Sequence, residues 1–191
     1  MKHAPARPIS PRSAGIWQDT SCTALMTDIS ALTQTELDAH FLRRSFEVAR
    51  RAMSHGNHPF GALLVDQHRK VLIEVENGFM PAHDHTAHAE RLLATQACTT
   101  IDANILRSAT LYSSAEPCAM CAGAIYWAGI GRLVYGLSEH RLRQLTGNHP
   151  ENPTLDLPCR EVFGSGQRST EVVGPLLEDE AAAVHAGVWD K

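Results

Sequence analysis

Two short segments of this chain limit its possible folds more than any other feature: His88-Ala89-Glu90 and Pro117-Cys118-Ala119-Met120-Cys121. The two cysteines are three residues apart, so on a helix they share a face and can bind one ion. Both segments stand near predicted helix starts, where the helix dipole favours thiolates, the form of cysteine that binds metal. The fold must therefore bring two helix N-termini together across the 29 residues that separate His88 from Cys118.

The ligand set predicts a catalytic zinc site rather than a structural one. His88, Cys118 and Cys121 supply three ligands and leave one position of a tetrahedral zinc ion open. Water at that position can be acidified to a pKa of roughly 7. Glu90 is two residues from His88, so it can lie near the metal without being a ligand and can carry protons to and from the reacting groups.

Other interpretations of these segments stay open. A lone Cys-x-x-Cys is also found in redox-active and structural sites. A non-catalytic, structural zinc module needs a fourth protein ligand. Cys98 or Cys159 could supply it, although neither has the spacing of a metal-binding motif. The histidines before the first segment, His83 and His85, are equally consistent with a polar loop.

Composition and charge narrow the class of protein. Hydrophobic residues make up 43% of the 191 residues, which fits one compact α/β domain. The formal net charge of −4 makes nucleic-acid binding an unfavoured function. Five cysteines, an odd number, argue against a disulfide framework and favour a reducing cytoplasm. Cys98 ends an apolar helical stretch, so we expect it to be a buried thiol.

The chain is expected to divide into a disordered tail over residues 1–30 and one domain over residues 31–191. The tail carries Pro5, Pro8 and Pro11 and no apolar run long enough for a signal peptide. The long apolar stretch at 119–131 is too short to span a bilayer, so no membrane association is expected.

The pattern of apolar residues predicts alternating strands and helices. Thr33 and Glu36 form a capping box that starts a helix running to about Ser54. Two strands in a hairpin follow, and Asp84 or Thr86 is expected to cap the next helix. The later elements are expected as strand 110–114, a helix to about 128 with Pro117 in its first turn, strand 132–136, helix 138–145, loop 147–158, strand 171–173 and helix 178–185. This order predicts a five-stranded mixed sheet with helices on both faces, a three-layer α/β/α sandwich.

Roughly residues 37–137 resemble the cytidine deaminase superfamily, in the branch that contains guanine deaminases, tRNA adenosine deaminases and yeast-type cytosine deaminases. The resemblance rests on Pro59-Phe60-Gly61-Ala62, Asn77, the segment 84–90 that ends in His88-Ala89-Glu90, and the segment 111–125 around Pro117-Cys118 and Cys121. It implies a zinc-dependent hydrolytic deaminase with one zinc ion per subunit. It also implies a homodimer in which the partner subunit forms part of the pocket wall.

The resemblance assigns further roles by position. Asn77 matches an asparagine that hydrogen-bonds the substrate, and Ala89 would offer its backbone to the base. Ser114 is expected at the strand end that faces the metal. Phe60 is expected to line the base pocket, with core packing as the alternative. Trp127 lies in Ala124-Ile125-Tyr126-Trp127-Ala128, which is similar to guanine deaminases.

The substrate implied by the resemblance is a small aminated nucleobase or nucleoside, with deamination of guanine to xanthine as the first interpretation. Cytosine or cytidine, an adenine-type substrate and tRNA adenosine are the alternatives. The segment from Cys159 to Trp189 is more similar to the end of cytosine deaminases. Glu151, Asp156 and Trp189 are the candidates for closing the pocket. A basic segment of the kind found in the tRNA enzymes is absent after residue 137, which makes nucleic acid an unlikely partner.

Overall fold

The computed structural model describes residues 29–147 and 149–190. The predicted tail therefore lies outside the described residues, apart from its last two positions. The elements run in the order η1 (Ile29–Ala31), α1 (Gln34–Ser54), β1 (Gly61–Val65), β2 (Val71–Glu76), α2 (Ala89–Thr100), α3 (Ala103–Ser108), β3 (Thr110–Ala115), α4 (Ala119–Ala128), β4 (Arg132–Leu137), α5 (Glu139–Thr146), α6 (Cys159–Gly164), β5 (Glu171–Val173) and α7 (Glu178–Ala183).

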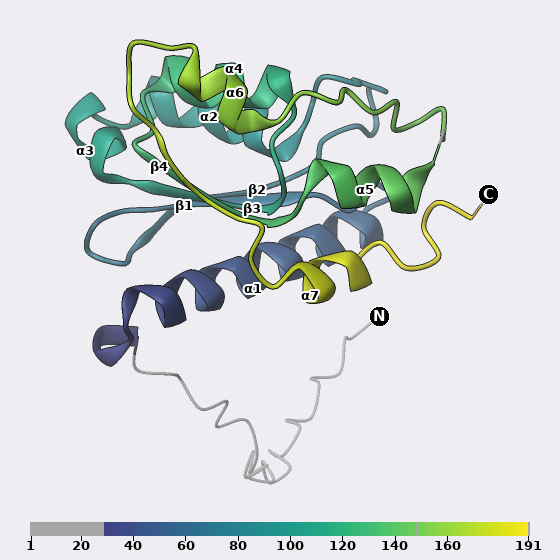
Figure 1. Cartoon of the computed structure of the whole chain (residues 1–191), viewed down its shortest axis with the longest axis horizontal. Helices are drawn as coiled ribbons and strands as arrows, with labels where there is room; N and C mark the ends of the chain where they lie inside the picture. Colours follow the sequence, from purple (N-terminus) through teal and green to yellow (C-terminus); the bar gives the residue numbers. More distant parts are fainter. Residues whose placement is uncertain (1–28, 148, 191) are drawn as a thin grey trace, which may run out of the picture.

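A five-stranded sheet in the order β2-β1-β3-β4-β5 forms the middle layer of the fold. β1 pairs antiparallel with β2 and with β3, whereas β3, β4 and β5 are parallel. Figure 1 shows α2, α4 and α6 on one face of the sheet and α1 and α7 on the other. The predicted three-layer α/β/α sandwich with a mixed sheet is confirmed.

α1 lies directly against the sheet because of its sequence and that of β1. Its N-terminus has the predicted capping box, in which the Thr33 side chain accepts from the Glu36 N–H and Glu36 accepts from the Thr33 N–H. Gly61 opens β1 where the helix passes closest. A Cβ there would lie 2.6 Å from the backbone nitrogen of Ala49, so only glycine permits this contact.

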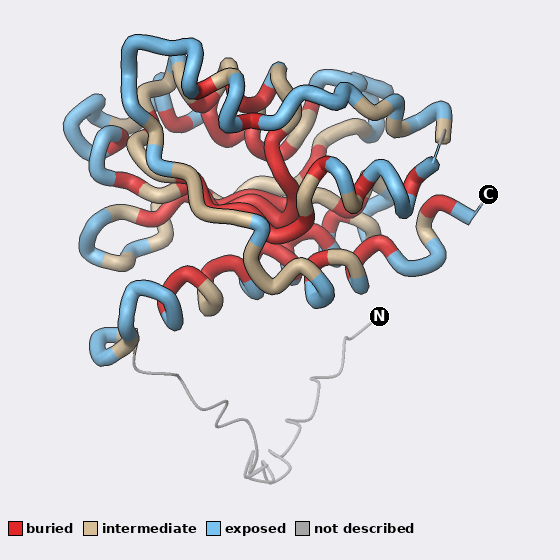
Figure 2. Tube along the Cα trace, viewed as in Figure 1, coloured by how far each residue is buried: buried red, intermediate tan, exposed pale blue. Residues whose placement is uncertain are grey.

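The alternating side chains of the central strands divide the interior into two cores. Leu111 and Leu133 pack with α2, α4 and α6, whereas Tyr112 and Val134 pack with α1, α5 and α7. Figure 2 shows the buried central strands between the two helical layers, with exposed residues at the periphery. Among the described residues no helix has both the length and the apolar character needed to cross a membrane.

The carboxyl ends of three strands meet at one edge of this sheet and position the site. β2, β3 and β4 run in the same direction, because β1 is antiparallel to both of its neighbours. Ligand sites in open α/β sheets form at such an edge. The segments that leave it carry Asn77 after β2, Cys118 after β3 and Glu139 after β4.

Some local predictions were wrong. Asp84 does not cap α2, because its carboxylate already accepts from the N–H and hydroxyl of Thr86 in a turn. His88 is instead the N-cap of α2, and Cys118 rather than Pro117 marks the start of α4. Cys98 is exposed, since it lies one position beyond the buried Ala97 on the outer side of α2. The six-residue helices α3 and α6 were missed, because segments this short show no helical periodicity.

Candidate active site

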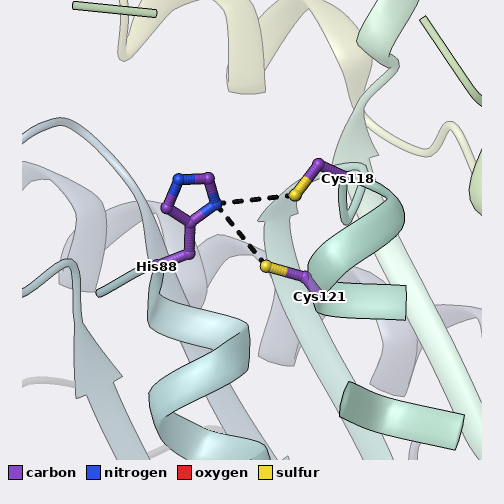
Figure 3. A group of neighbouring side chains, drawn as sticks. All are labelled: His88, Cys118 and Cys121. Carbon is purple, nitrogen blue, oxygen red and sulfur yellow. Dashed lines mark hydrogen bonds between the residues drawn. The ribbon is translucent and has the colours of Figure 1, made fainter. Parts of the chain in front are cut away.

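The three predicted metal ligands converge at the N-termini of α2 and α4, as Figure 3 shows. His88 Nδ1 lies 3.7 Å from Cys118 Sγ and 3.5 Å from Cys121 Sγ. A tetrahedral zinc ion with bonds of roughly 2.3 Å to sulfur and 2.0–2.1 Å to nitrogen would place these atoms about 3.6 Å apart. The donor set and its spacing therefore fit zinc.

The group contains three ligands within the described residues, with ligand atoms within 4.8 Å of one another. Neither of the two alternative cysteines joins it. Cys98 is exposed on α2, and Cys159 is buried at the start of α6. The site thus has the composition of a catalytic zinc centre, and a zinc ion held there supplies a Lewis acid with an open position.

The electrostatics of the two cysteines suit metal binding. A hydrogen bond from Cys121 lowers the pKa of the Cys118 thiol far below its ordinary value, and a hydrogen bond from His88 adds to this. The same pairing with Cys118, together with burial, raises the pKa of Cys121. One thiolate is thus already favoured by the protein, and metal binding would release the second proton.

Glu90 lies behind the ligands with only 5% of its surface exposed. Its Oε1 accepts a hydrogen bond of 2.7 Å from Ser113 Oγ, and its Oε2 lies 3.7 Å from Cys121 Sγ. Burial raises the pKa of the Glu90 carboxyl, while the charge of His88 and the Ser113 hydrogen bond oppose the rise. A carboxyl group so placed can exchange a proton with a reactant beside the metal.

Ser113, and not Ser114 as predicted, faces the metal side of the sheet. The Ser114 hydroxyl accepts instead from the backbone N–H of Gly61 at 3.1 Å. Successive side chains of a strand point to opposite faces, and Ser113 shares its face with Leu111, which packs against α2 and α4. The predicted residue was wrong by one position in the strand, and adjacent residues of a strand point to opposite faces of the sheet.

A cleft of about 270 Å³ opens in front of the ligands. It is lined by Phe60, His85, His88, Glu90, Ala115, Glu116, Cys118, Met120, Glu139, Leu142, Glu151, Asn152, Pro153 and Leu155. A narrow extension of about 20 Å³ adds Asn77, Phe79, His58 and Asp84. The sequence prediction missed Glu139, although its position directly after a strand parallel to β3 was a signal for this edge.

Two of the predicted substrate-binding residues, Phe60 and Asn77, border this cleft or its extension, whereas the buried Ala89 is not part of the lining. Phe60 lines both parts of it. Asn77 is buried and borders the extension, and its Oδ1 accepts from the N–H of Phe79 at 3.0 Å, so this bond does not use the two side-chain N–H groups. Ala89 is the first residue of α2, where backbone N–H groups have no partner within the helix.

Trp127 lies away from this cleft in its own chain. It is near the C-terminal end of α4, whereas the two cysteines stand at the beginning of that helix. Its surface is 77% exposed, and it lines a different groove with Cys98 and Arg168. The helix thus separates Trp127 from the metal ligands along its length.

In the C-terminal segment, Trp189 packs beside two residues that line the cleft and its extension, Phe60 and His58. The indole is buried, and its Nε1 donates to His185 Nδ1 at 3.2 Å. Its ring centroid lies 6.5 Å from that of Phe60 and 6.0 Å from that of His58. Of the other two candidates for closing the pocket, Glu151 borders the cleft, whereas Asp156 forms an exposed ion pair with Arg143 at 2.8 Å.

Known proteins that are similar to this chain include several deaminases. The family model described as "Cytidine and deoxycytidylate deaminase zinc-binding region" matches residues 35–137. A probable cytosine deaminase of Schizosaccharomyces pombe is 41% identical over 163 residues, which is 85% of this chain and 98% of that protein. A guanine deaminase of Bacillus subtilis is 39% identical over 101 residues, or 52% of this chain and 64% of that protein. A tRNA-specific adenosine deaminase of Haemophilus influenzae is 38% identical over 112 residues, or 59% and 65% of the two chains.

Solved structures of deaminases have a similar fold. A tRNA:A34 deaminase has a TM-score of 0.57 at 31% identity and covers 76% of this chain and 99% of its own. A guanine deaminase from Nitrosomonas europaea has a TM-score of 0.59 at 24% identity, covers 75% and 80% of the two chains, and shares the fold. The family model includes all three metal ligands and more than half of the chain. The chain therefore belongs to the cytidine deaminase superfamily and is a zinc-dependent hydrolytic deaminase.

Proposed function

We propose that this enzyme deaminates a free nucleobase, with cytosine as the first candidate and guanine as the second. The observation that carries the proposal is the cleft of about 270 Å³ that holds the metal ligands and Glu90. This volume lies just below the range of roughly 300–1,000 Å³ that is typical of sites for drug-sized ligands. A single aromatic ring suits such a cleft better than a nucleotide does.

The position of Trp127 changes the order of the two candidate bases. Similarity around Trp127 favoured guanine in the sequence, but this side chain lies outside the cleft of its own chain. The C-terminal segment, by contrast, packs behind the cleft wall, because the ring centroid of Trp189 lies 6.5 Å from that of Phe60, which lines the cleft. The S. pombe relative, a probable cytosine deaminase, is matched over 98% of its length and thus far beyond the zinc-binding region. These two facts support cytosine over guanine.

The charge of the cleft argues against RNA as substrate. Its described lining contains four carboxyl groups, Glu90, Glu116, Glu139 and Glu151, and no lysine or arginine. Proteins that bind nucleic acid neutralise phosphates with basic side chains. The 38% identity with a tRNA-specific deaminase keeps tRNA as an alternative for the experiment below.

The residues of the cleft account for the reaction. Deamination adds water to the carbon that bears the amino group and releases ammonia. We assign the proton transfers to Glu90, which takes a proton from the attacking water and delivers it to the adjacent ring nitrogen. It then takes the remaining proton from the hydroxyl group that was added to this carbon and passes it to the departing amine, so that the carbonyl forms as ammonia leaves. The Asn77 amide is placed to donate to a ring carbonyl, and Phe60 to contact the face of the ring.

We also propose that the enzyme forms a homodimer. A tryptophan that is 77% exposed on α4, next to the groove that Cys98 and Arg168 line, supports burial of this surface against a second copy. Sedimentation equilibrium tests the association, and a monomer at micromolar concentration would exclude it.

The test of function is ammonia release by the zinc-loaded protein from cytosine, guanine, adenine, their nucleosides and a tRNA anticodon hairpin. We expect turnover of a free base, with cytosine ahead of guanine. Release of ammonia from nucleosides alone or from the hairpin alone would refute the free-base assignment. Turnover of guanine without cytosine would restore the purine interpretation.

A further inference from the structure

Two of the four glutamates that line the cleft, Glu116 and Glu139, differ in the hydrogen bonds that their carboxylates accept. Glu116 has both carboxylate oxygens occupied. Oε2 accepts from the backbone N–H of Glu139 at 3.0 Å, and Oε1 accepts from the backbone N–H of Cys159 at 3.1 Å. These N–H groups belong to the first residues of α5 and α6. Glu116 therefore holds two helix N-termini together, and its role is structural.

No comparable structural role accounts for a carboxylate at Glu139. Only 8% of its surface is exposed, yet within the described part of the chain its carboxylate has no hydrogen-bond or ion-pair partner. Burial raises the pKa of the Glu139 carboxyl to about 7, and the negative charges of Cys118, Glu116, Asp156 and Glu90 act in the same direction. A buried carboxyl group without a partner costs stability, and an apolar side chain would cost less.

The position of Glu139 points to a ligand. It follows β4 directly and lines the cleft that also contains His88, Glu90 and Cys118. Asn77 follows β2, on the opposite side of β1 and β3 in the sheet order. A ring between them would meet a donor amide on one side and an acceptor carboxyl on the other. Substrate donors would satisfy the oxygens that the protein leaves free.

We propose that Glu139 is a substrate-binding residue that accepts a hydrogen bond from a ring N–H of the base, away from the reacting amino group. This rests on the proposed function. A free base carries such an N–H at the nitrogen that bears the sugar in a nucleoside. The contact would therefore select free bases over nucleosides and over bases methylated at that nitrogen. Rejection of analogues that lack the donor is strong, because the acceptor is then buried without a partner.

The test compares Glu139→Leu with wild type on cytosine and 1-methylcytosine, and on guanine and 9-methylguanine. A hydrogen bond to a charged group contributes roughly 1.5–3 kcal/mol, so kcat/KM for the free base should fall about tenfold to a hundredfold. A contact made equally in the ground and transition states raises KM more than it lowers kcat. The preference of wild type for the unmethylated base should shrink by the same factor, because the variant has no acceptor to lose.

Thermal unfolding separates a binding role from a structural one. Leucine replaces a buried, unpartnered carboxyl by an apolar side chain, so Glu139→Leu should unfold at the same or a higher temperature than wild type. Glu116→Gln is the matched control. It should unfold at a lower temperature, because it weakens the acceptors of two backbone N–H groups, but it should keep the preference for the unmethylated base.

The outcomes distinguish this inference from the function on which it rests. Wild-type enzyme that deaminates nucleosides but no free base would refute both. Wild-type activity on free bases, with a preference over the methylated base that survives in Glu139→Leu, would refute the role of Glu139 alone. A clear fall in unfolding temperature for Glu139→Leu would also refute it, since the residue would then be structural.

Discussion

Two neighbouring residues of β3 hydrogen-bond two buried carboxylates on opposite faces of the sheet. On the α1 face, Tyr112 donates to Asp38 at 2.8 Å, and Arg132 donates to both oxygens of the same carboxylate at 2.8 Å. On the α2 face, Ser113 donates to Glu90 at 2.7 Å. Asp38 thus has strong donors on both oxygens, whereas the second oxygen of Glu90 has only a thiol at 3.7 Å.

The pKa shifts of the two groups go in opposite directions. Burial acts to raise the pKa of Asp38, but the hydrogen bonds from Arg132 and Tyr112 outweigh it and hold the pKa below its usual value. Burial raises the pKa of Glu90, and its neighbours compensate only in part. The face with a complete set of partners serves stability, and the face with an incomplete set is available for chemistry.

The largest effect that this comparison predicts is on the rate of Glu90→Gln. Glutamine keeps the shape but cannot take up a proton, so kcat for the base that wild type turns over should fall by about 10³-fold or more. Zinc content and unfolding temperature should stay near wild type, because Glu90 is not a ligand. Ammonia release and metal analysis of the same sample measure both. Retained zinc with undiminished activity would contradict the role of Glu90.

Asp38→Asn should show the reverse pattern. It leaves Arg132 mostly buried without its main partner, which lowers the free energy of unfolding by about 3 kcal/mol. The kcat of the folded enzyme should not change. Glu171→Gln is the control, since this exposed partner of Arg132 should contribute less than about 1 kcal/mol. Urea unfolding measures the free energies, and equal losses in the two variants would contradict the comparison.

Acid should weaken the ion pair between Asp38 and Arg132 and so destabilise the folded protein. The folded-state pKa of Asp38 lies below its unfolded value, so the unfolded chain binds more protons as the pH falls. The stability due to the pair is complete above about pH 4 and is lost as the pH falls through the folded-state pKa. Urea midpoints of wild type should therefore approach those of Asp38→Asn in this range.

The sequence predicted the parts of the fold that depend on local pattern. The Thr33–Glu36 capping box and the alternating strands each contain their signal within a few residues. The metal ligands were predictable because their spacing is itself the chemical requirement. The missed helices α3 and α6 are six residues long, so their sequences carry little periodicity and tertiary packing decides their existence.

The walls of the cleft were harder to predict than its metal centre. Ser113 and Ser114 are both serines, and their side chains point to opposite faces of the sheet. Which of the two contacts Glu90 depends only on which face of β3 is turned toward α2. Trp127 was chosen by resemblance, although its place on the helix puts it far from the cysteines. Glu116 and Glu139 likewise differ only in which backbone N–H groups come within reach, which depends on how α5 and α6 pack.

The smallest predicted effect tests which of two adjacent serines of β3 faces the metal, with a matched pair of variants. Ser113→Ala removes one hydrogen bond to Glu90, which contributes about 1 kcal/mol, so kcat should fall roughly fivefold. Ser114→Ala should leave kcat unchanged and lower the free energy of unfolding by about 1 kcal/mol, because the Gly61 N–H loses its acceptor. Both substitutions delete the same hydroxyl from adjacent buried positions, so loss of side-chain volume cannot explain a difference between them. If Ser114→Ala slowed the reaction and Ser113→Ala did not, the strand would present the other face to the metal.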